Sequence, residues 1–238
     1  MNAAARIADN LATIRQRMAD AATRAGRSVG SVKLVAVTKY VPVETARLLV
    51  EAGCRDLGES RPQELWSKAE ALRRADLGEV HWHLIGHLQR NKVRRTLPLV
   101  SLIHTVDSER LLSALDEEAR AVGSQRAEVL IEVNISGDES KTGLAPSAVE
   151  LLLATAGTMS GVAVRGLMGM ASLTGGPMTA QSNFAALRSL RDRLRPNLPQ
   201  GVSLNELSMG MSDDFELAIA EGATIVRVGS ALVEGVVT

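Results

Sequence analysis

Residues 207–235 read LSMGMSDDFELAIAEGATIVRVGSALVEG. This stretch predicts a strand, a turn at Gly210, a helix with acidic residues in its first turn, a second strand and a further turn at Gly229–Ser230. Each turn alone is typical of an ordinary strand connection. Two such turns at successive strand ends offer converging backbone N–H groups, which favours a cradle for a phosphate group.

The same strand–helix alternation runs back through the chain. Short β-rich runs lie at 33–39, 55–59, 80–86, 100–107, 127–135, 162–170, 202–209 and 223–229, and helical patterns lie at 43–53, 62–75, 89–97, 108–123, 146–157, 178–194 and 212–222. Sustained alternation of this kind indicates a parallel sheet. About eight units predict a (β/α)8 TIM barrel, with a doubly wound open sheet as the alternative.

One further helix is expected before the first strand. Ile7, Leu11, Ile14 and Met18 are spaced as one face of a helix, which Gly26 ends. No linker, repeat or low-complexity tract divides the sequence. We therefore expect a single domain over residues 1–238, an α/β barrel with an extra N-terminal helix.

Composition excludes several classes of function. The chain has 27 basic and 27 acidic residues, so its net charge of zero argues against a nucleic acid or an anionic membrane surface as a partner. There is no apolar run of about 18 residues, so no membrane span is expected. The single cysteine, Cys54, allows no internal disulfide and fits a reducing compartment. A cytoplasmic protein is expected.

Three polar residues stand where they could serve the phosphate cradle. Lys39 ends the first β-rich run, so we expect it at the barrel mouth, partly desolvated, where an amine can form a Schiff base. Ser212 is expected to cap the helix at 212–222. Arg227 lies between two valines, and alternation puts its side chain on the other face of the strand, where a buried guanidinium needs an acceptor. A surface lysine and a structural ion pair are the alternative readings.

Histidines and methionines also stand at strand ends. His81 and His83 share one face of a strand, but no carboxylate or cysteine is spaced to complete a zinc site, so no metal is expected. His87 is the better candidate for the barrel mouth. Met168 is one of several methionines near strand ends, and it could form an apolar wall against a cofactor ring or simply fill the core.

Six segments of the chain resemble one known family. They occur in the order AVTKYVP, GESRPQE, HWHLIGHLQRNK, VNISGDESKTGL, GLMGMAS and LSMGMSDDFELAIAEGATIVRVGSA, from about residue 33 to residue 231. Together they resemble the pyridoxal phosphate homeostasis protein family. The resemblance implies a barrel of the alanine racemase N-terminal-domain type, without that enzyme's second domain.

The resemblance also implies a cofactor and its contacts. It implies pyridoxal 5′-phosphate bound to Lys39 as an internal aldimine, phosphate contacts from Ser212 and the Gly229–Ser230 turn, and Arg227 facing the pyridine nitrogen. A guanidinium cannot give up a proton to the ring, so the ring is a poorer electron sink.

The remaining cofactor-binding candidates are Ser60, His87 and Met168. At position 60 the family usually has Asn, which is expected near the cofactor. At position 230 the serine keeps both a hydroxyl and a backbone N–H.

Three functions are compatible with these patterns. The first is a carrier in intracellular vitamin B6 homeostasis, a monomer that binds pyridoxal phosphate without dedicated turnover and has pyridoxal phosphate-dependent apo-enzymes as partners. The second is an amino-acid racemase, which needs an acid–base tyrosine opposite Lys39. The one tyrosine, Tyr40, is adjacent to Lys39 and is expected to point away from it. The third is a Schiff-base aldolase acting on a sugar phosphate.

Overall fold

The computed structural model describes residues 2–123, 126–138, 142–172 and 174–236. Eight parallel strands close into a barrel in chain order. The strands are β1 (Lys33–Val37), β2 (Asp56–Glu59), β3 (His81–Leu84), β4 (Leu102–Val106), β5 (Ala127–Val133), β6 (Val162–Gly169), β7 (Val202–Ser208) and β8 (Ile225–Val228). β8 pairs with β1, with Val35 opposite Arg227, and this pairing closes the sheet. The predicted (β/α)8 barrel is confirmed, and the open doubly wound sheet is wrong.

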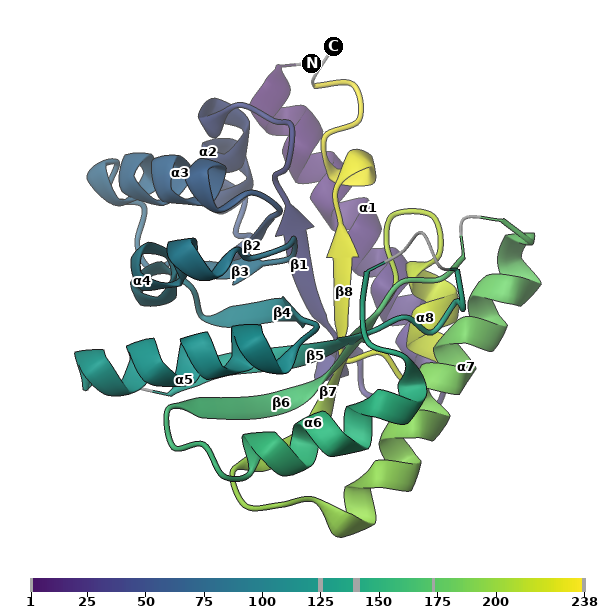
Figure 1. Cartoon of the computed structure of the whole chain (residues 1–238). Helices are drawn as coiled ribbons and strands as arrows, with labels where there is room; N and C mark the ends of the chain where they lie inside the picture. The colour runs from purple at the N-terminus through teal and green to yellow at the C-terminus, as the bar shows by residue number, and fades with distance from the viewer. Residues whose placement is uncertain (1, 124–125, 139–141, 173, 237–238) are drawn as a thin grey trace.

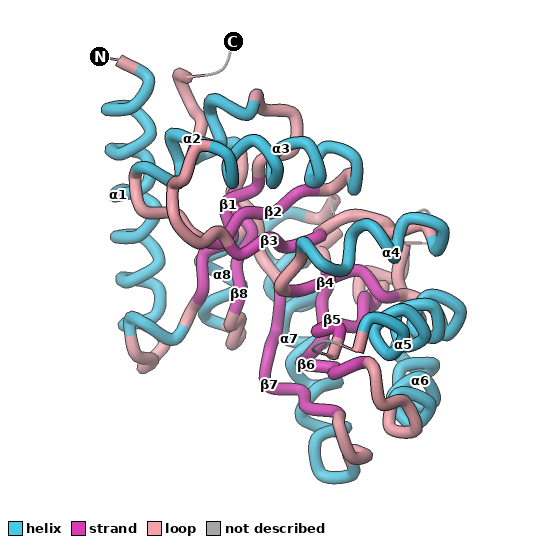
Figure 2. The backbone as a smooth tube through the Cα atoms, turned by 90° about the vertical axis from the view of Figure 1, so that its left-hand side faces the viewer, coloured by secondary structure: helices cyan, strands magenta, loops and turns pink. Residues whose placement is uncertain are grey.

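Helices surround the barrel and connect its strands (Figure 1). They are α1 (Ala3–Arg24), α2 (Val43–Glu51), α3 (Pro62–Arg74), α4 (Val93–Thr96), α5 (Glu109–Val122), α6 (Val149–Ala156), α7 (Gly176–Leu194) and α8 (Phe215–Ala220). The expected extra helix is α1, which runs along the outside of the barrel beside β1 and β8 (Figure 2). Its buried residues include Ile7, Leu11, Ile14 and Met18, the face that the spacing predicts.

Apolar side chains form two layers. A large cluster fills the space between the strands and the helices, and it includes Val226 and Val228 of β8. A second cluster lies inside the barrel and consists of Val35, Leu102, Leu130, Met168 and Ile225. Alternation along each strand separates the two layers, because successive side chains point to opposite faces of the sheet.

Two predicted elements differ from the structure. The helix expected at 89–97 is a 3-10 turn at Arg90–Lys92, a short α4 and a second 3-10 turn at Leu97–Leu99. Pro98 lies in that last turn, and a proline lacks the N–H that a continuing α-helix would need. The first strand ends at Val37, so Lys39 lies just beyond it.

A helix that crosses a bilayer needs about 20 consecutive, mainly apolar residues. Among the described residues, no helix is long and apolar enough to do so.

Candidate functional site

The carboxyl end of β1 places Lys39 at the barrel mouth. Val35 points into the barrel, so alternation brings Val37 and then Lys39 to the same side. Lys39 is exposed, and its Nζ lies 5.8 Å from the centroid of the Tyr40 ring. Two expectations are therefore wrong. The amine is not partly desolvated, and Tyr40 does not point away from it, because Tyr40 has a left-handed backbone with φ 67° that turns its ring toward Lys39.

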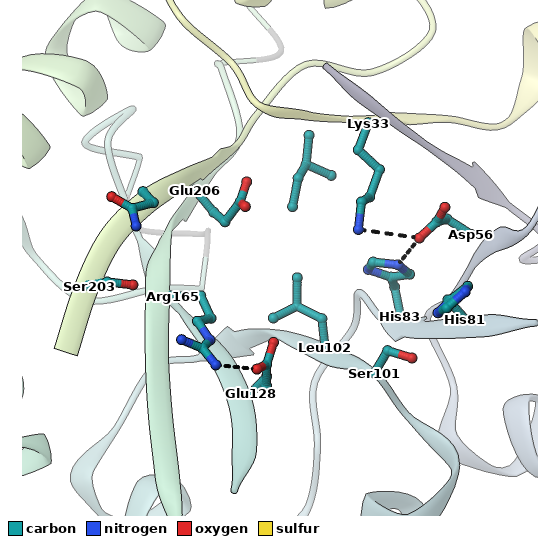
Figure 3. Close-up of a pocket in the computed structure, with 12 residues that line it drawn as sticks. Lys33, Asp56, His81, His83, Ser101, Leu102, Glu128, Arg165, Ser203 and Glu206 are labelled. Atoms are coloured by element: carbon teal, nitrogen blue, oxygen red, sulfur yellow. Dashed lines mark hydrogen bonds and ion pairs between the residues drawn. The ribbon is translucent and has the colours of Figure 1, made fainter. Parts of the chain in front are cut away.

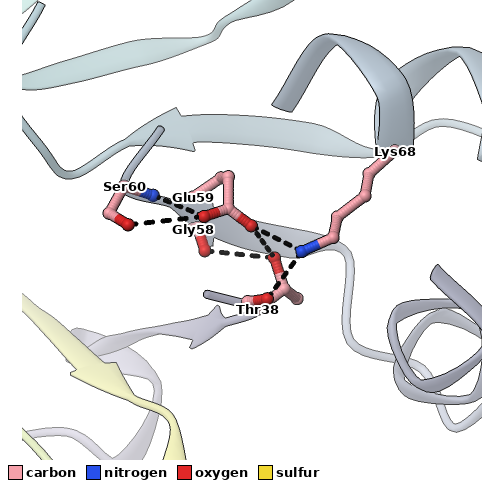
Figure 4. A network of polar contacts seen from close by, with 5 residues as sticks. All are labelled: Thr38, Gly58, Glu59, Ser60 and Lys68. Carbon is pink, nitrogen blue, oxygen red and sulfur yellow. Dashed lines mark hydrogen bonds and ion pairs between the residues drawn. The ribbon is translucent and has the colours of Figure 1, made fainter. Parts of the chain in front are cut away.

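A buried ion pair holds the backbone next to Lys39 (Figure 4). Lys68 of α3 donates from Nζ to the backbone carbonyl of Thr38 and to Oε2 of Glu59, both at 2.7 Å. The other carboxylate oxygen of Glu59 accepts from the backbone N–H of Ser60 at 2.8 Å. The side chains of Lys68 and Glu59 are 6% and 1% exposed. This one ion pair therefore holds Thr38, which precedes Lys39 just beyond β1, and the backbone of Ser60, which follows β2.

The ends of β7 and β8, where the sequence predicts the phosphate cradle, lie close together. Oγ of Ser212 accepts from the backbone N–H of Gly229 at 3.2 Å. A Cβ on Gly229 would stand 3.2 Å from the Cβ of Val37, so the end of β8 packs tightly against the end of β1. Gly210 has φ +91°, and a Cβ there would stand 2.6 Å from that of Ala218. At both glycines the chain packs too closely for a larger residue.

The prediction that Ser212 caps the following helix is wrong. α8 begins at Phe215 with Asp214 at the N-cap position. The Asp214 carboxylate accepts from the backbone N–H of Met211 at 2.5 Å and closes a turn over residues 211–214. Because Asp214 occupies the N-cap position, the hydroxyl of Ser212 is free of that role and contacts Gly229.

Arg227 lies inside the barrel, as alternation predicts, and is 5% exposed. It donates from Nη1 to Oγ of Ser208 at 2.6 Å and from Nη2 to the carbonyl of Gly169 at 3.3 Å. Burial lowers the pKa of Arg227 to about 10, and the carboxylates of Asp214 and Glu132 oppose that shift. The guanidinium therefore stays charged at neutral pH, and these two contacts use only part of its five N–H donors.

The residues present fit a phosphorylated aldehyde cofactor. Lys39 supplies an accessible amine, and the turn at Gly229–Ser230 lies beside the hydroxyl of Ser212. Arg227 supplies donors from the barrel interior. An amine that can bond to an aldehyde, a phosphate cradle and a ring-facing donor are the groups that such a cofactor requires.

The other candidates lie at different depths around the mouth. Ser60 lines a cavity of about 330 Å³ together with Lys39. His87 is exposed after β3, with Nδ1 3.9 Å from the carboxylate of Asp107. Met168 is 1% exposed and belongs to the apolar cluster inside the barrel. Met209 instead packs in the outer layer, so the methionines do not form one wall.

The histidines make contacts that the spacing does not reveal. His83 and His104 are hydrogen-bonded to each other at 2.9 Å, and His83 also contacts Asp56. Among the described residues, no group of three or more His, Cys, Asp or Glu side chains could hold a metal ion. Of the two histidines in the HWH motif only His83 is buried, and its partners His104 and Asp56 lie on other strands.

Comparison with known proteins agrees with this geometry. The sequence profile of the alanine racemase N-terminal domain family matches residues 4–235. A protein of Mycobacterium tuberculosis named pyridoxal phosphate homeostasis protein is 39% identical over 237 residues, covering 93% of this chain and 90% of that protein.

Two solved structures are similar over almost their whole length. A Bifidobacterium adolescentis protein of unknown function is 41% identical with a TM-score of 0.90, covering 96% of this chain and 95% of that one. PipY of Synechococcus elongatus with bound pyridoxal phosphate is 37% identical with a TM-score of 0.83, covering 95% of this chain and 99% of that one. This chain therefore belongs to the pyridoxal phosphate homeostasis protein family, whose fold is the alanine racemase N-terminal barrel.

Proposed function

We propose that this protein binds pyridoxal 5′-phosphate, held covalently by the amine of Lys39, and serves in the homeostasis of this cofactor. One observation carries the proposal. β1 pairs with β8, which brings the strand end that bears Lys39 against the turn at Gly229. An amine, a phosphate cradle and a buried guanidinium then lie on two neighbouring strands. PipY, a relative over almost its whole length, has been solved with this cofactor bound.

Each group has a separate task in this proposal. Ser212 and the Gly229–Ser230 turn hold the phosphate through hydroxyls and backbone N–H groups. Ser60 and His87 stand at the rim of the mouth, and Met168 closes its floor. Arg227 donates to the ring nitrogen.

Arg227 also favours a carrier over an enzyme. When bound, the cofactor supplies an electron sink for carbanions, and that sink is strongest when the ring nitrogen is protonated. The guanidinium is buried and remains charged, so it donates a hydrogen bond without transferring its proton. We therefore propose that the protein performs no dedicated turnover.

The racemase alternative depends on Tyr40, the one tyrosine of the chain. Racemisation needs acid–base groups on both faces of the cofactor. The Tyr40 ring lies against the amine of Lys39 and is 79% exposed, so it occupies the same side as the lysine. A tyrosine on that side cannot act as the opposite acid.

The test is uptake of the cofactor by the purified protein. We expect a visible absorption band after incubation with pyridoxal phosphate, and a mass increase of one reduced cofactor after borohydride treatment. Lys39→Arg keeps the charge but removes the reactive amine, so band and mass increase should both disappear. Lys33→Arg, at the other end of the same strand, should keep both. Persistence of the adduct in Lys39→Arg would show that another residue holds the cofactor.

We also propose that the protein acts in the cytoplasm as a monomer, and that pyridoxal phosphate-dependent apo-enzymes receive the cofactor from it. The single cysteine, Cys54, allows no internal disulfide, which fits a reducing compartment. Transfer to a purified apo-enzyme, faster than from free cofactor at equal concentration, would support direct delivery.

A further inference from the structure

A chain of buried polar side chains crosses the inside of the barrel. Nη1 of Arg227 lies 2.6 Å from Oγ of Ser208, which lies 2.9 Å from Nδ1 of His104. Nε2 of His104 lies 2.9 Å from Nδ1 of His83, and Nε2 of His83 lies 3.1 Å from Oδ1 of Asp56. These five residues, which we call the interior chain, come from β8, β7, β4, β3 and β2.

The interior chain joins the two ends of the barrel. Arg227 is near the carboxyl end of β8, whereas Asp56 is the first residue of β2. Asp56 lines a cavity of about 500 Å³ at the amino ends of the strands and pairs with Lys33 at 3.5 Å (Figure 3). Between these ends, His104 and Ser208 are fully buried and His83 is 1% exposed. The links between the two mouths are therefore shielded from water.

The carboxylate of Asp56 and two neutral imidazoles together fix the direction of the hydrogen bonds. A guanidinium can only donate, so Ser208 accepts from Arg227 with one lone pair and still has both a hydrogen and a second lone pair for Nδ1 of His104. The direction is therefore fixed from the Asp56 end: when both imidazoles are neutral, His104 donates from Nε2 to Nδ1 of His83, and its bare Nδ1 accepts the hydrogen of Ser208.

His83 in turn donates from Nε2 to Asp56, whose carboxylate can only accept. Each imidazole thus carries one proton, on Nε2, and each ring nitrogen in the interior chain has one partner.

The opposite direction would put a second cation inside the barrel. His83 would have to donate from both ring nitrogens and would be charged at a site 1% exposed. Burial lowers the pKa of His83, although Asp56 opposes the shift. Burial, followed by the charges of His83 and Arg227, lowers the pKa of His104 well below its usual value. Two neutral imidazoles satisfy the contacts without that cost.

We propose that Asp56, His83, His104 and Ser208 are positioning residues for Arg227, acting through one directed row of hydrogen bonds that ends at the opposite mouth. The proposal rests on the proposed function, in which Arg227 faces the cofactor ring. Nearby Asp214 and Glu132 supply negative charge to Arg227, but they make no hydrogen bond to it among the described residues. The orientation of the guanidinium is set instead by Ser208 and by the carbonyl of Gly169.

The direction of the interior chain can be tested without any cofactor. Nitrogen-15 NMR of ligand-free protein at neutral pH distinguishes protonated from bare ring nitrogens. For both His83 and His104 we expect a bare Nδ1 and a protonated Nε2. A proton on Nδ1 of either ring, or two protons on one ring, would overturn the proposal.

The coupling along the interior chain is tested with variants. Ser208→Ala removes the acceptor of Arg227, and we expect the band of bound pyridoxal phosphate to move and its dissociation constant to rise on the order of tenfold. Asp56→Asn is the milder change. It should shift the nitrogen-15 NMR signals of the His104 ring, although Asp56 does not contact His104. His81→Gln alters the same cavity beside the interior chain and should change none of these signals.

The positioning role would be overturned if Ser208→Ala and His81→Gln had the same absorption band and the same dissociation constant for pyridoxal phosphate. An unmoved His104 signal in Asp56→Asn would do the same. Should the wild-type protein take up no pyridoxal phosphate, the proposed function fails, while the NMR spectrum still decides whether the hydrogen bonds run from Arg227 toward Asp56.

Discussion

At the scale of single residues, the buried histidine His104 has the most direct effect on stability. It is fully buried, and its pKa lies well below the usual value because of burial first and then its cationic neighbours. In the unfolded chain the same ring titrates near pH 6.5. Below that pH the ring is protonated in the unfolded state but stays neutral in the folded state, so stability is lost as the pH falls.

We therefore predict that the free energy of unfolding decreases on acidification from about pH 7.5 to about pH 5.5, with a slope of up to ~1.4 kcal/mol per pH unit from His104. His104→Asn should have a shallower slope, whatever its absolute stability. Urea unfolding at several pH values between about 5.5 and 7.5 measures the slope. His87→Asn, a change at an exposed histidine, should keep the wild-type slope. Equal slopes for wild type and His104→Asn would contradict the prediction.

At the scale of elements, the pair between Glu59 and Lys68 joins α3 to the ends of β1 and β2. Removing one partner of a buried pair leaves an uncompensated charge, which costs about 3–5 kcal/mol. Lys68→Met should lose stability by this amount. The double variant Glu59→Gln/Lys68→Met should lose less than the sum of the two single changes, because no charge is then left unpaired.

Urea unfolding of the four proteins in this cycle provides the measurement. The exposed pair of Arg47 and Glu51, one helical turn apart on α2, offers a matched control. Arg47→Met should cost less than about 1 kcal/mol. A loss of that small size in Lys68→Met would mean that the buried pair does not hold the strand ends.

Local patterns predicted the elements well and their partners poorly. The run Leu34–Val37 forms β1, and the spacing of Ile7 and Leu11 identifies the buried face of α1. The start of α8 was not predicted correctly, because Ser212 followed by two aspartates resembles a helix cap. In the structure Asp214 closes a turn with Met211, and the helix begins only at Phe215.

Sites that depend on distant residues could not be predicted in the same way. His104 and Ser208 are 104 positions apart, so no spacing rule joins them. The candidates Lys39, Gly229 and Arg227 were identified because alternation and turn chemistry are local. Next to Lys39, Tyr40 has a left-handed backbone, a conformation that a tyrosine rarely adopts and that no local pattern predicts.

At the scale of the whole molecule, α1 covers the seam where β8 meets β1. It packs against α8, and Nδ2 of Asn10 donates to the carbonyls of Leu232 and Glu234. Arg17 on the same helix pairs with Glu216 of α8 at 2.6 Å. The helix that precedes the barrel thus binds its last segments.

We predict that Leu11→Ala, at a site 2% exposed in α1, lowers the free energy of unfolding by about 2–5 kcal/mol. Removal of the buried side chain leaves a cavity at the seam, and the whole barrel should lose stability. Thermal or urea unfolding measures the loss. Gln16→Ala, on the exposed face of the same helix, should change stability by no more than about 0.5 kcal/mol. Similar values for the two variants would show that α1 is not needed for closure.

The pairing of β1 with β8 also has a consequence for biosynthesis. The amine and part of the phosphate turn proposed to hold the cofactor follow the first and last strands, and Lys39 leaves the ribosome long before Gly229 and Ser230. A growing chain therefore presents a reactive amine without a phosphate cradle until translation is almost complete. If the proposed residues hold the cofactor, only a chain whose barrel is closed can bind it through both groups.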